Sequence, residues 1–155
     1  MIIFLGNIGV LSPLRNGGYF DFYSTLPKFE AWFRRFENLN LVICLDYPDK
    51  NLTQLKSHFS KDIQNKIIGH YVPLRSNYCI EDINNWISIN DYTGNWIGIQ
   101  SEYLEMPTGN FENQEKIFLC KFFEGGFDDF QIKRIDKLLG KFVVGKALLQ
   151  KSLLS

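Results

Sequence analysis

The sequence predicts an α/β domain with a mainly parallel sheet and helices on both faces, a three-layer sandwich. Short continuous apolar runs, each ended by turn-forming residues, indicate strands buried on both faces. They alternate with segments whose apolar residues recur every three or four positions, which is typical of helices. The chain has 155 residues, 45% hydrophobic and 22% charged, so we expect one hydrophobic core in a single domain over residues 1–155.

Four segments are predicted to be strands, because each is a short apolar run next to turn formers or polar residues. They are Ile2–Leu5, Leu41–Leu45, Asn95–Ile99 and Lys116–Lys121. Between the first strand and the first helix, residues 12–24 combine Pro, Gly and Asn with four aromatic residues. This segment is therefore expected to be a long ordered loop.

Five segments have helical spacing of their apolar residues. They are residues 25–38, 51–59, 60–68, 78–89 and 128–139, the second and third being continuous. Thr25 or Ser24 is the expected cap of the first helix, with Pro27 in its first turn, and Asn51 is the expected cap of the second. The amphipathic tail over residues 141–154 is expected to add a short helix or strand.

Charge and cysteine content exclude several classes of protein. Seventeen Lys and Arg balance seventeen Asp and Glu, and this neutral chain lacks the broad positive field of a nonspecific nucleic-acid binder. No apolar run approaches the ~20 residues of a membrane span, and no signal-peptide pattern is present. Cys44, Cys79 and Cys120 form no C-x-x-C pair and are expected to be buried thiols. We expect a cytoplasmic protein whose partner is neither nucleic acid nor membrane.

Parallel α/β sheets bind ligands beyond the carboxyl ends of their strands, at the point where chain direction across the sheet switches. Four segments are expected to surround that place. They are residues 6–11, Cys44–Pro48, the region near Arg75, and Gln100–Glu102.

At these places the chain resembles the haloacid dehalogenase (HAD) superfamily, most closely the small HAD-like domain of Swiss army knife RNA-repair proteins. Ile3–Leu11, with the sequence IFLGNIGVL, is similar to the family's apolar strand followed by D-x-D-G-V-L. Residues 41–47, 55–69, 96–101 and 126–139 follow the order of its later segments, and Arg75 stands where a basic residue holds the phosphate. The resemblance implies a Rossmann-like fold and, in active members, an Asp nucleophile, an Asp general acid/base and Mg²⁺.

The residues that would perform this chemistry are replaced. Positions 6 and 8 of an extended segment point to the same side, where two carboxylates can share one site, but the chain has Gly6 and Ile8. Neither can attack phosphorus or bind Mg²⁺, which requires oxygen ligands. Cys44 replaces the family's hydroxyl and Gln100 one of its acids. We predict a catalytically inactive domain without metal or other cofactor. Its vestigial pocket consists of Gly6, Ile8, Cys44, Asp46, Arg75 and Gln100.

Two other functions stay open. A relocated metal site of Asp21, Asp46 and Glu102 would make the chain a residual metal-dependent phosphatase, although turn and capping roles are favoured for these acids. An RNA-end-binding accessory domain would use Arg75 and the basic helix from Gln131 to Lys146, and the neutral charge counts against it.

A thiol nucleophile at Cys44 would need a neighbouring base and a lowered pKa. The two histidines, His58 and His70, are expected to lie on a helix surface and in a turn, away from the strand ends. For each pattern that could indicate an enzyme, a structural role of the same residues is therefore the favoured interpretation.

Binding to another protein is the function that the sequence favours. The aromatic loop residues Tyr19, Phe20, Phe22 and Tyr23 are candidate contacts, because exposed aromatic side chains are typical interface anchors. An alternative is that their rings close over the pocket as a lid. Tyr103 and Met106, in the connection over residues 103–112, are further candidates. An immunity or antitoxin-type inhibitor that binds a toxin is one form of this prediction.

Overall fold

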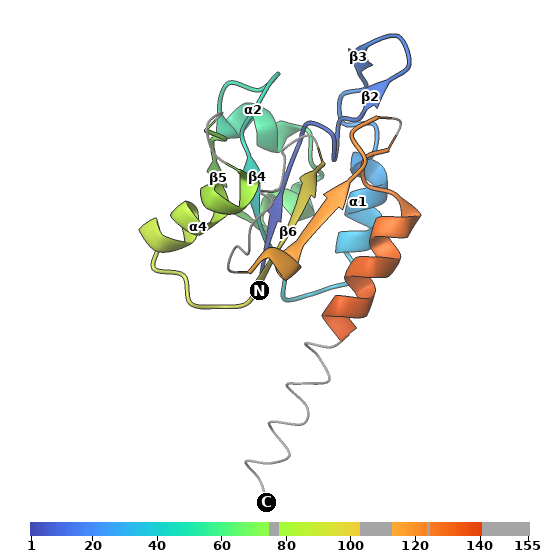
Figure 1. Ribbon diagram of the computed structural model, residues 1–155. Coiled ribbons are helices and arrows are strands. Elements are labelled where there is room, and N and C mark those ends of the chain that lie inside the picture. The colour runs from blue at the N-terminus through green and yellow to red at the C-terminus, as the bar shows by residue number, and fades with distance from the viewer. Residues whose placement is uncertain (75–77, 103–112, 124, 141–155) are drawn as a thin grey trace, which may run out of the picture.

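Five parallel strands form the central sheet of the protein, for which we obtained a computed structural model that describes residues 1–74, 78–102, 113–123 and 125–140. Their order across the sheet is β5-β4-β1-β6-β7 (Figure 1). The strands are β1 (Ile2–Leu5), β4 (Asn40–Cys44), β5 (Ile67–Tyr71), β6 (Trp96–Ser101) and β7 (Ile117–Cys120). The mainly parallel α/β sheet predicted from the sequence is confirmed.

The chain fills the sheet outward from its centre in two directions. From β1 it passes to β4 and then to the edge strand β5, and it next returns to place β6 on the other side of β1, with β7 outside it. β1 therefore pairs with both β4 and β6 in parallel. The direction of the chain switches between β1 and β6, which is where doubly wound sheets form ligand sites.

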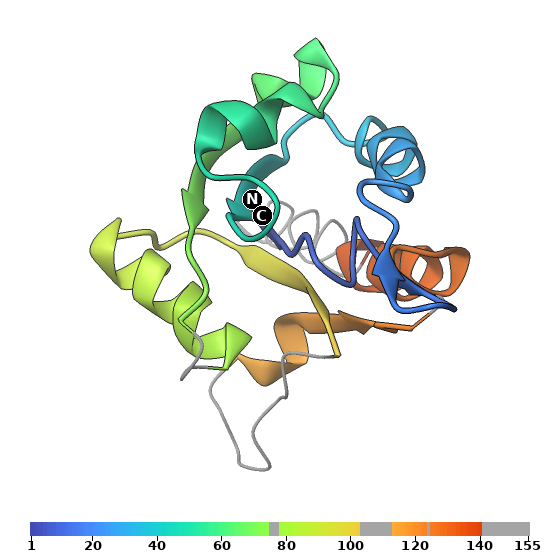
Figure 2. The same cartoon turned by 90° about the horizontal axis from the view of Figure 1, so that it is seen from above.

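Helices cover both faces of the sheet (Figure 2). One core cluster joins the sheet to α1 (Leu26–Phe33), α2 (Leu52–Ser57), α3 (Lys61–Gln64) and the helical residues 129–140. The cluster on the opposite face joins it to α4 (Cys79–Ile89). A 3₁₀ turn, η1 (Gln114–Lys116), precedes β7. No helix of the described residues is long and apolar enough to span a membrane.

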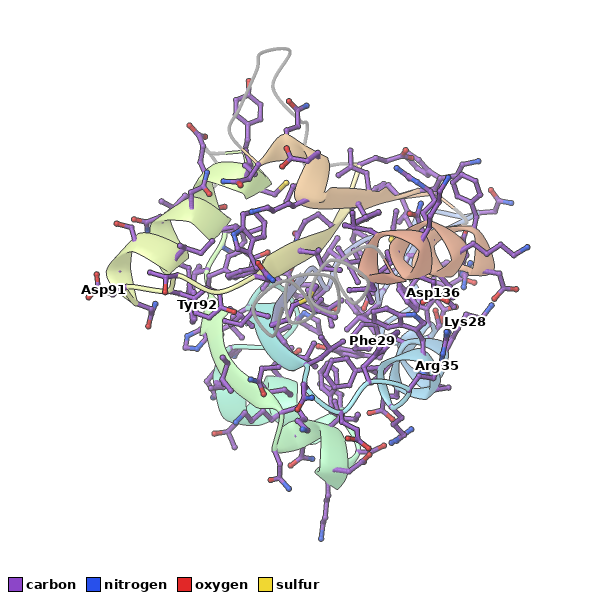
Figure 3. The ribbon with its side chains drawn as sticks, turned by 90° about the horizontal axis from the view of Figure 1, so that it is seen from below. Lys28, Phe29, Arg35, Asp91, Tyr92 and Asp136 are labelled. Carbon is purple, nitrogen blue, oxygen red and sulfur yellow. The ribbon has the colours of Figure 1, made fainter. Side chains whose placement is uncertain are left out.

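The helix over residues 129–140 is held against α1 by polar contacts between charged side chains and one indole (Figure 3). Asp136 accepts hydrogen bonds from the Trp32 indole and the Arg35 guanidinium, each at 2.9 Å. Lys28 forms an ion pair of 3.1 Å with Asp129. The ion pairs are exposed and contribute little free energy, so the buried aromatic side chains of α1 provide most of the attachment.

Two parts of the predicted secondary structure are wrong. Residues 60–68 are not one helix: α3 ends at Gln64 and β5 begins at Ile67, because Lys66 C=O accepts the Leu41 N–H and starts the ladder with β4. The predicted loop over residues 12–24 contains a hairpin of β2 (Leu14–Arg15) and β3 (Tyr19–Phe20). Its turn uses Gly17 and Gly18, whose φ values of 101° and 78° favour glycine.

The third predicted strand ends too early. Residues 95–99 were predicted, but β6 spans Trp96–Ser101, so Gln100 and Ser101 lie inside the sheet instead of beyond it. Pairing with β7 extends β6, since Gln100 faces Leu119 and Ser101 faces Cys120 in the register. The predicted tail over residues 141–154 lies outside the described residues.

Candidate functional site

The carboxyl edge of the sheet brings together most of the predicted pocket residues. Gly6 and Ile8 follow β1, Asp46 follows β4, and Gln100 lies near the end of β6. The backbone N–H of Ile8 donates to Asp46 Oδ2 at 3.4 Å, and the Cys44 thiol lies 3.8 Å from the same oxygen. Arg75 lies outside the described residues.

At residue 6, directly after β1, neighbouring side chains leave little room for a side chain larger than that of glycine. A Cβ atom added to Gly6 would lie 3.1 Å from both Gln100 Oε1 and Val10 Cγ2. Gln100 is fully buried and cannot move aside freely, since its Oε1 accepts from the Tyr71 hydroxyl at 3.0 Å and its Nε2 donates to Phe4 C=O at 2.9 Å. A carboxylate at residue 6 would therefore meet an amide oxygen held in place by two hydrogen bonds.

The acid and the thiol at the end of β4 differ from exposed groups of their type. Burial raises the pKa of Asp46 to about 6, and hydrogen bonds from Ile8 and Asn7 act in the opposite direction. Its Oδ1 is buried without a hydrogen-bond partner. Burial, followed by the charge of Asp46, raises the pKa of the Cys44 thiol well above its usual range. A raised pKa disfavours the thiolate, which is the form in which a cysteine acts as a nucleophile.

Next to Asp46 lies a polar cluster that the sequence analysis did not identify. The hydroxyl of Tyr23 donates to Asp49 Oδ2 and accepts from Asn7 Nδ2, the latter at 3.2 Å. The other oxygen of Asp49 is 2.9 Å from His58 Nε2. The rings of Tyr23 and His58 are stacked, with centroids 3.9 Å apart and planes 18° apart. His58 is exposed at the end of α2, as predicted for a helix-surface residue, and it also belongs to this edge. The prediction of a turn at His70 is wrong, because His70 lies in β5.

This cluster fixes loops and provides no nucleophile. Burial and the neighbouring Asp49 carboxylate raise the pKa of Tyr23 far above its usual range, so its hydroxyl stays protonated. Tyr23 also adopts a left-handed backbone conformation with φ of 59°. Its ring thus turns inward, which joins the segment after β3 to the loop between β4 and α2. No local sequence pattern predicts the cluster, because its four members come from four separate segments.

Other aromatic side chains at this edge form a cluster in which Tyr19, Phe22, Tyr47 and Phe123 are exposed and Phe20 and Phe122 lie beneath them. We call this the aromatic surface; its residues are Tyr19, Phe20, Phe22, Tyr47, Phe122 and Phe123. Five of its rings contact one another in sequence, from Phe123 through Phe122, Phe20 and Phe22 to Tyr47, with centroids 5.1 to 6.0 Å apart.

The aromatic surface is accessible to solvent. The exposed fractions are 40% for Phe22, 59% for Tyr19, 66% for Phe123 and 70% for Tyr47. Of the predicted aromatic contacts, Tyr19 and Phe22 are thus exposed, Phe20 is partly buried, and Tyr23 is turned into the polar cluster. The predicted contacts Tyr103 and Met106 lie outside the described residues.

The acids of the alternative metal site have separate partners. Asp21 forms an ion pair of 3.0 Å with Arg15, and Glu102 Oε1 accepts the Phe122 N–H at 3.1 Å. Among the described residues, no group of three or more His, Cys, Asp or Glu side chains is placed to hold a metal ion. On the basic helix, the Arg134 guanidinium lies 5.6 Å from the centroids of two phenylalanine rings, so its position is set by packing.

Comparison of the chain with protein-family models, with curated proteins and with solved structures finds no match.

Proposed function

We propose that this protein is a catalytically inactive HAD-like domain that binds another protein through the aromatic surface at the carboxyl edge of its sheet. The observation that carries the proposal is a run of five contacting rings contributed by three segments far apart in the sequence. Three of these rings, Phe22, Tyr47 and Phe123, are exposed, and the buried Phe122 and partly buried Phe20 support them from below. It lies at the edge where α/β domains bind their ligands. Large aromatic side chains dominate the binding energy of protein interfaces.

Loss of catalysis is supported by how the edge is packed. The space beside Gly6 is occupied by Gln100 and Val10, so an acid at this position has no room without rearrangement. Asp46, at the end of the neighbouring strand β4, has one oxygen that accepts the Ile8 N–H and the other buried without a hydrogen-bond partner. Phosphoryl transfer depends on charges that stabilise the transferred group, and the end of β1 presents Gly6, Ile8 and the neutral amide of Gln100 in place of such charges.

A protein partner is favoured over a small molecule by the shape of the surface. Tyr47, Phe123 and Tyr19 are each more than half exposed, so they project into solvent and do not line an enclosed cavity. Small-molecule sites are concave and bury most of their ligand. Inhibition of a toxin is one form of such binding, and the neutral net charge then requires an apolar contact in place of electrostatic steering.

Site-specific photo-crosslinking tests the proposal. We expect p-benzoyl-phenylalanine at position 22 or 47 to crosslink one defined protein in cells that produce the chain, and the double variant Phe22→Ala, Tyr47→Ala to lose binding to that purified protein by at least tenfold. Phe130 is a matched control, because it is 63% exposed and lies outside the aromatic surface. Equal crosslinking from positions 22 and 130, or unchanged affinity of the double variant, would contradict the proposal.

A separate assay tests the inactivity. With Mg²⁺ and a generic phosphomonoester, we expect the wild-type chain to hydrolyse no more substrate than its Asp46→Ala variant. Mg²⁺-dependent hydrolysis that disappears in Asp46→Ala would replace the proposal with the residual phosphatase predicted as an alternative from the sequence.

A further inference from the structure

The edge strand β5 presents unpaired backbone groups to solvent. It pairs with β4 on one side, and in the described part of the chain no strand lies on its other side. Tyr71 C=O accepts the Leu45 N–H, so it points toward β4. Because successive residues of a strand alternate in direction, the N–H and C=O of His70 point away from the sheet. Figure 2 shows β5 at the margin of the sheet, with its outer side open.

The opposite edge strand, β7, is protected in ways that β5 is not. Cys120 C=O accepts from Glu102, so Leu119 C=O points outward, and there the buried Gln131 side chain donates to it at 2.8 Å. Lys66 and Pro73 flank residues 67–72 much as Lys116 and Lys121 flank β7, so the flanking residues do not distinguish the two edges. The difference lies in the strand itself: no buried side chain is shown to cap β5 as Gln131 caps β7 among the described residues, and residues 67–72 contain neither Lys nor Pro, the residues that usually keep edge strands from pairing.

A groove with an apolar rim runs along the open side of β5. It is a cavity of about 470 Å³ between β5 and α4. Four of its lining residues are apolar and more than half exposed: Ile68, Val72, Leu74 and Ile89, with exposed fractions of 51%, 57%, 52% and 72%. Ile68 is turned outward by a bulge, because the register with β4 passes from Ile67 to Gly69 without pairing it.

We propose that β5 pairs in antiparallel orientation with β5 of a second copy of this chain, so that two sheets join into one across a twofold axis beside His70. About such an axis, the outward N–H and C=O of His70 meet those of the second copy, and Ile68 lies opposite Val72. Two exposed apolar side chains thus become a cross-strand pair, which stabilises antiparallel strands.

The surface is complementary to itself in the way that a twofold interface requires. Both the projecting side chains and the groove that receives them belong to β5, to the residues that directly follow it, and to α4. The net charge of +0 leaves no overall repulsion between copies. This interface is separate from the aromatic surface and does not depend on the proposed function.

Sedimentation velocity of the full chain at about 5 to about 200 µM, a range that detects dimers with micromolar dissociation constants, tests the proposal. We expect a reversible monomer–dimer equilibrium. His70→Pro removes the outward N–H, which proline tolerates at an edge strand, and is expected to weaken the dimer at least tenfold. His70→Ala is the matched control, because it removes the side chain and keeps the N–H; it is expected to dimerise within about threefold of wild type.

A second variant keeps the test decisive if His70→Pro lowers the fraction of folded protein. Val72→Lys places a charge opposite Ile68 and is expected to give a folded monomer, whereas Phe130→Lys, remote from β5, is expected to remain dimeric. A wild-type chain that remains monomeric at about 200 µM overturns the proposal. This outcome covers the alternative in which β5 pairs with a strand of another protein and not with a second copy. A dimer that survives Val72→Lys also overturns it.

Discussion

The end of β1 and the end of β4 lie next to each other at the carboxyl edge, but they differ in how their buried polar groups are hydrogen-bonded. At β1, Gly6 adjoins the neutral amide of Gln100, whose nitrogen and oxygen both have partners. At β4, Asp46 keeps an ionisable carboxyl group with one buried oxygen unpaired. The end of β1, the neutral half of the edge, is thus packed in a way that stabilises the fold. At the end of β4, the charged half, burial of the Asp46 carboxylate lowers the stability of the fold.

The largest expected effect on stability comes from removing the Gln100 amide from the neutral half of the edge. Gln100→Leu leaves the Tyr71 hydroxyl without its buried acceptor and removes the side-chain hydrogen bond to Phe4 C=O, so we expect the free energy of unfolding to fall by about 3 kcal/mol in urea denaturation. Gln54→Leu, at an exposed glutamine, is the control, with an expected loss below about 1 kcal/mol. Equal losses in the two variants would mean that the buried amide does not hold the edge together.

Neutralising Asp46 in the charged half of the edge is expected to raise the stability of the protein, not to lower it. The pKa of Asp46 in the folded protein, about 6, is above its value of 3.8 in an unfolded chain, so the folded state binds more protons between these pH values. Stability therefore falls as pH rises from about 4 to 6, and the cost is fully present above pH ~6. We expect Asp46→Asn to raise the free energy of unfolding at pH 7 by ~2 kcal/mol and to leave it unchanged below pH ~4.

Urea denaturation between pH 4 and pH 7 measures this difference, within the window set by the two pKa values. Asp62→Asn is the control: the Arg34 guanidinium lowers the pKa of this exposed carboxyl, so removing its charge is not expected to stabilise the protein. A pH-independent difference between wild type and Asp46→Asn would show that the carboxyl group is not strained by burial.

The smallest effect on stability is expected from removing the Tyr23 hydroxyl, which connects the segment after β3 to the carboxyl edge. Tyr23→Phe removes the hydroxyl between Asn7 and Asp49 but keeps the ring on His58, so the expected loss is about 1 kcal/mol. Hydrogen exchange of residues 21–24 is expected to accelerate at the same time, since their attachment is local. Tyr19→Phe, at an exposed ring, is expected to change neither quantity.

Continuous apolar segments were predictable from the sequence, whereas short or edge elements were not. Ile2–Leu5 is a strand as predicted, because a strand buried on both faces is apolar throughout. Ile67 and Ile68 continue the helical spacing from Ile63, so β5 was interpreted as helix; its pairing with β4 decides otherwise. The two-residue strands of the hairpin are too short to show any alternation.

The site was predictable only where residues directly follow strands. Gly6 and Asp46 were placed correctly at the edge by that rule. Gln100 was expected beyond its strand, but pairing with β7 keeps it inside. The partners of His58 come from the segment after β3 and the loop after β4, so only the tertiary structure brings them together.

The central position of β1 has a consequence for synthesis of the chain. Of the five strands of this sheet, β1 is made first and requires neighbours on both sides. Leu5 pairs with Ile43, which is made soon afterwards, but with Ile99 only after β5 and α4 have also been translated. A nascent chain on the ribosome thus carries an incomplete sheet until β6 emerges, which makes this interval the period of greatest vulnerability to aggregation and proteolysis.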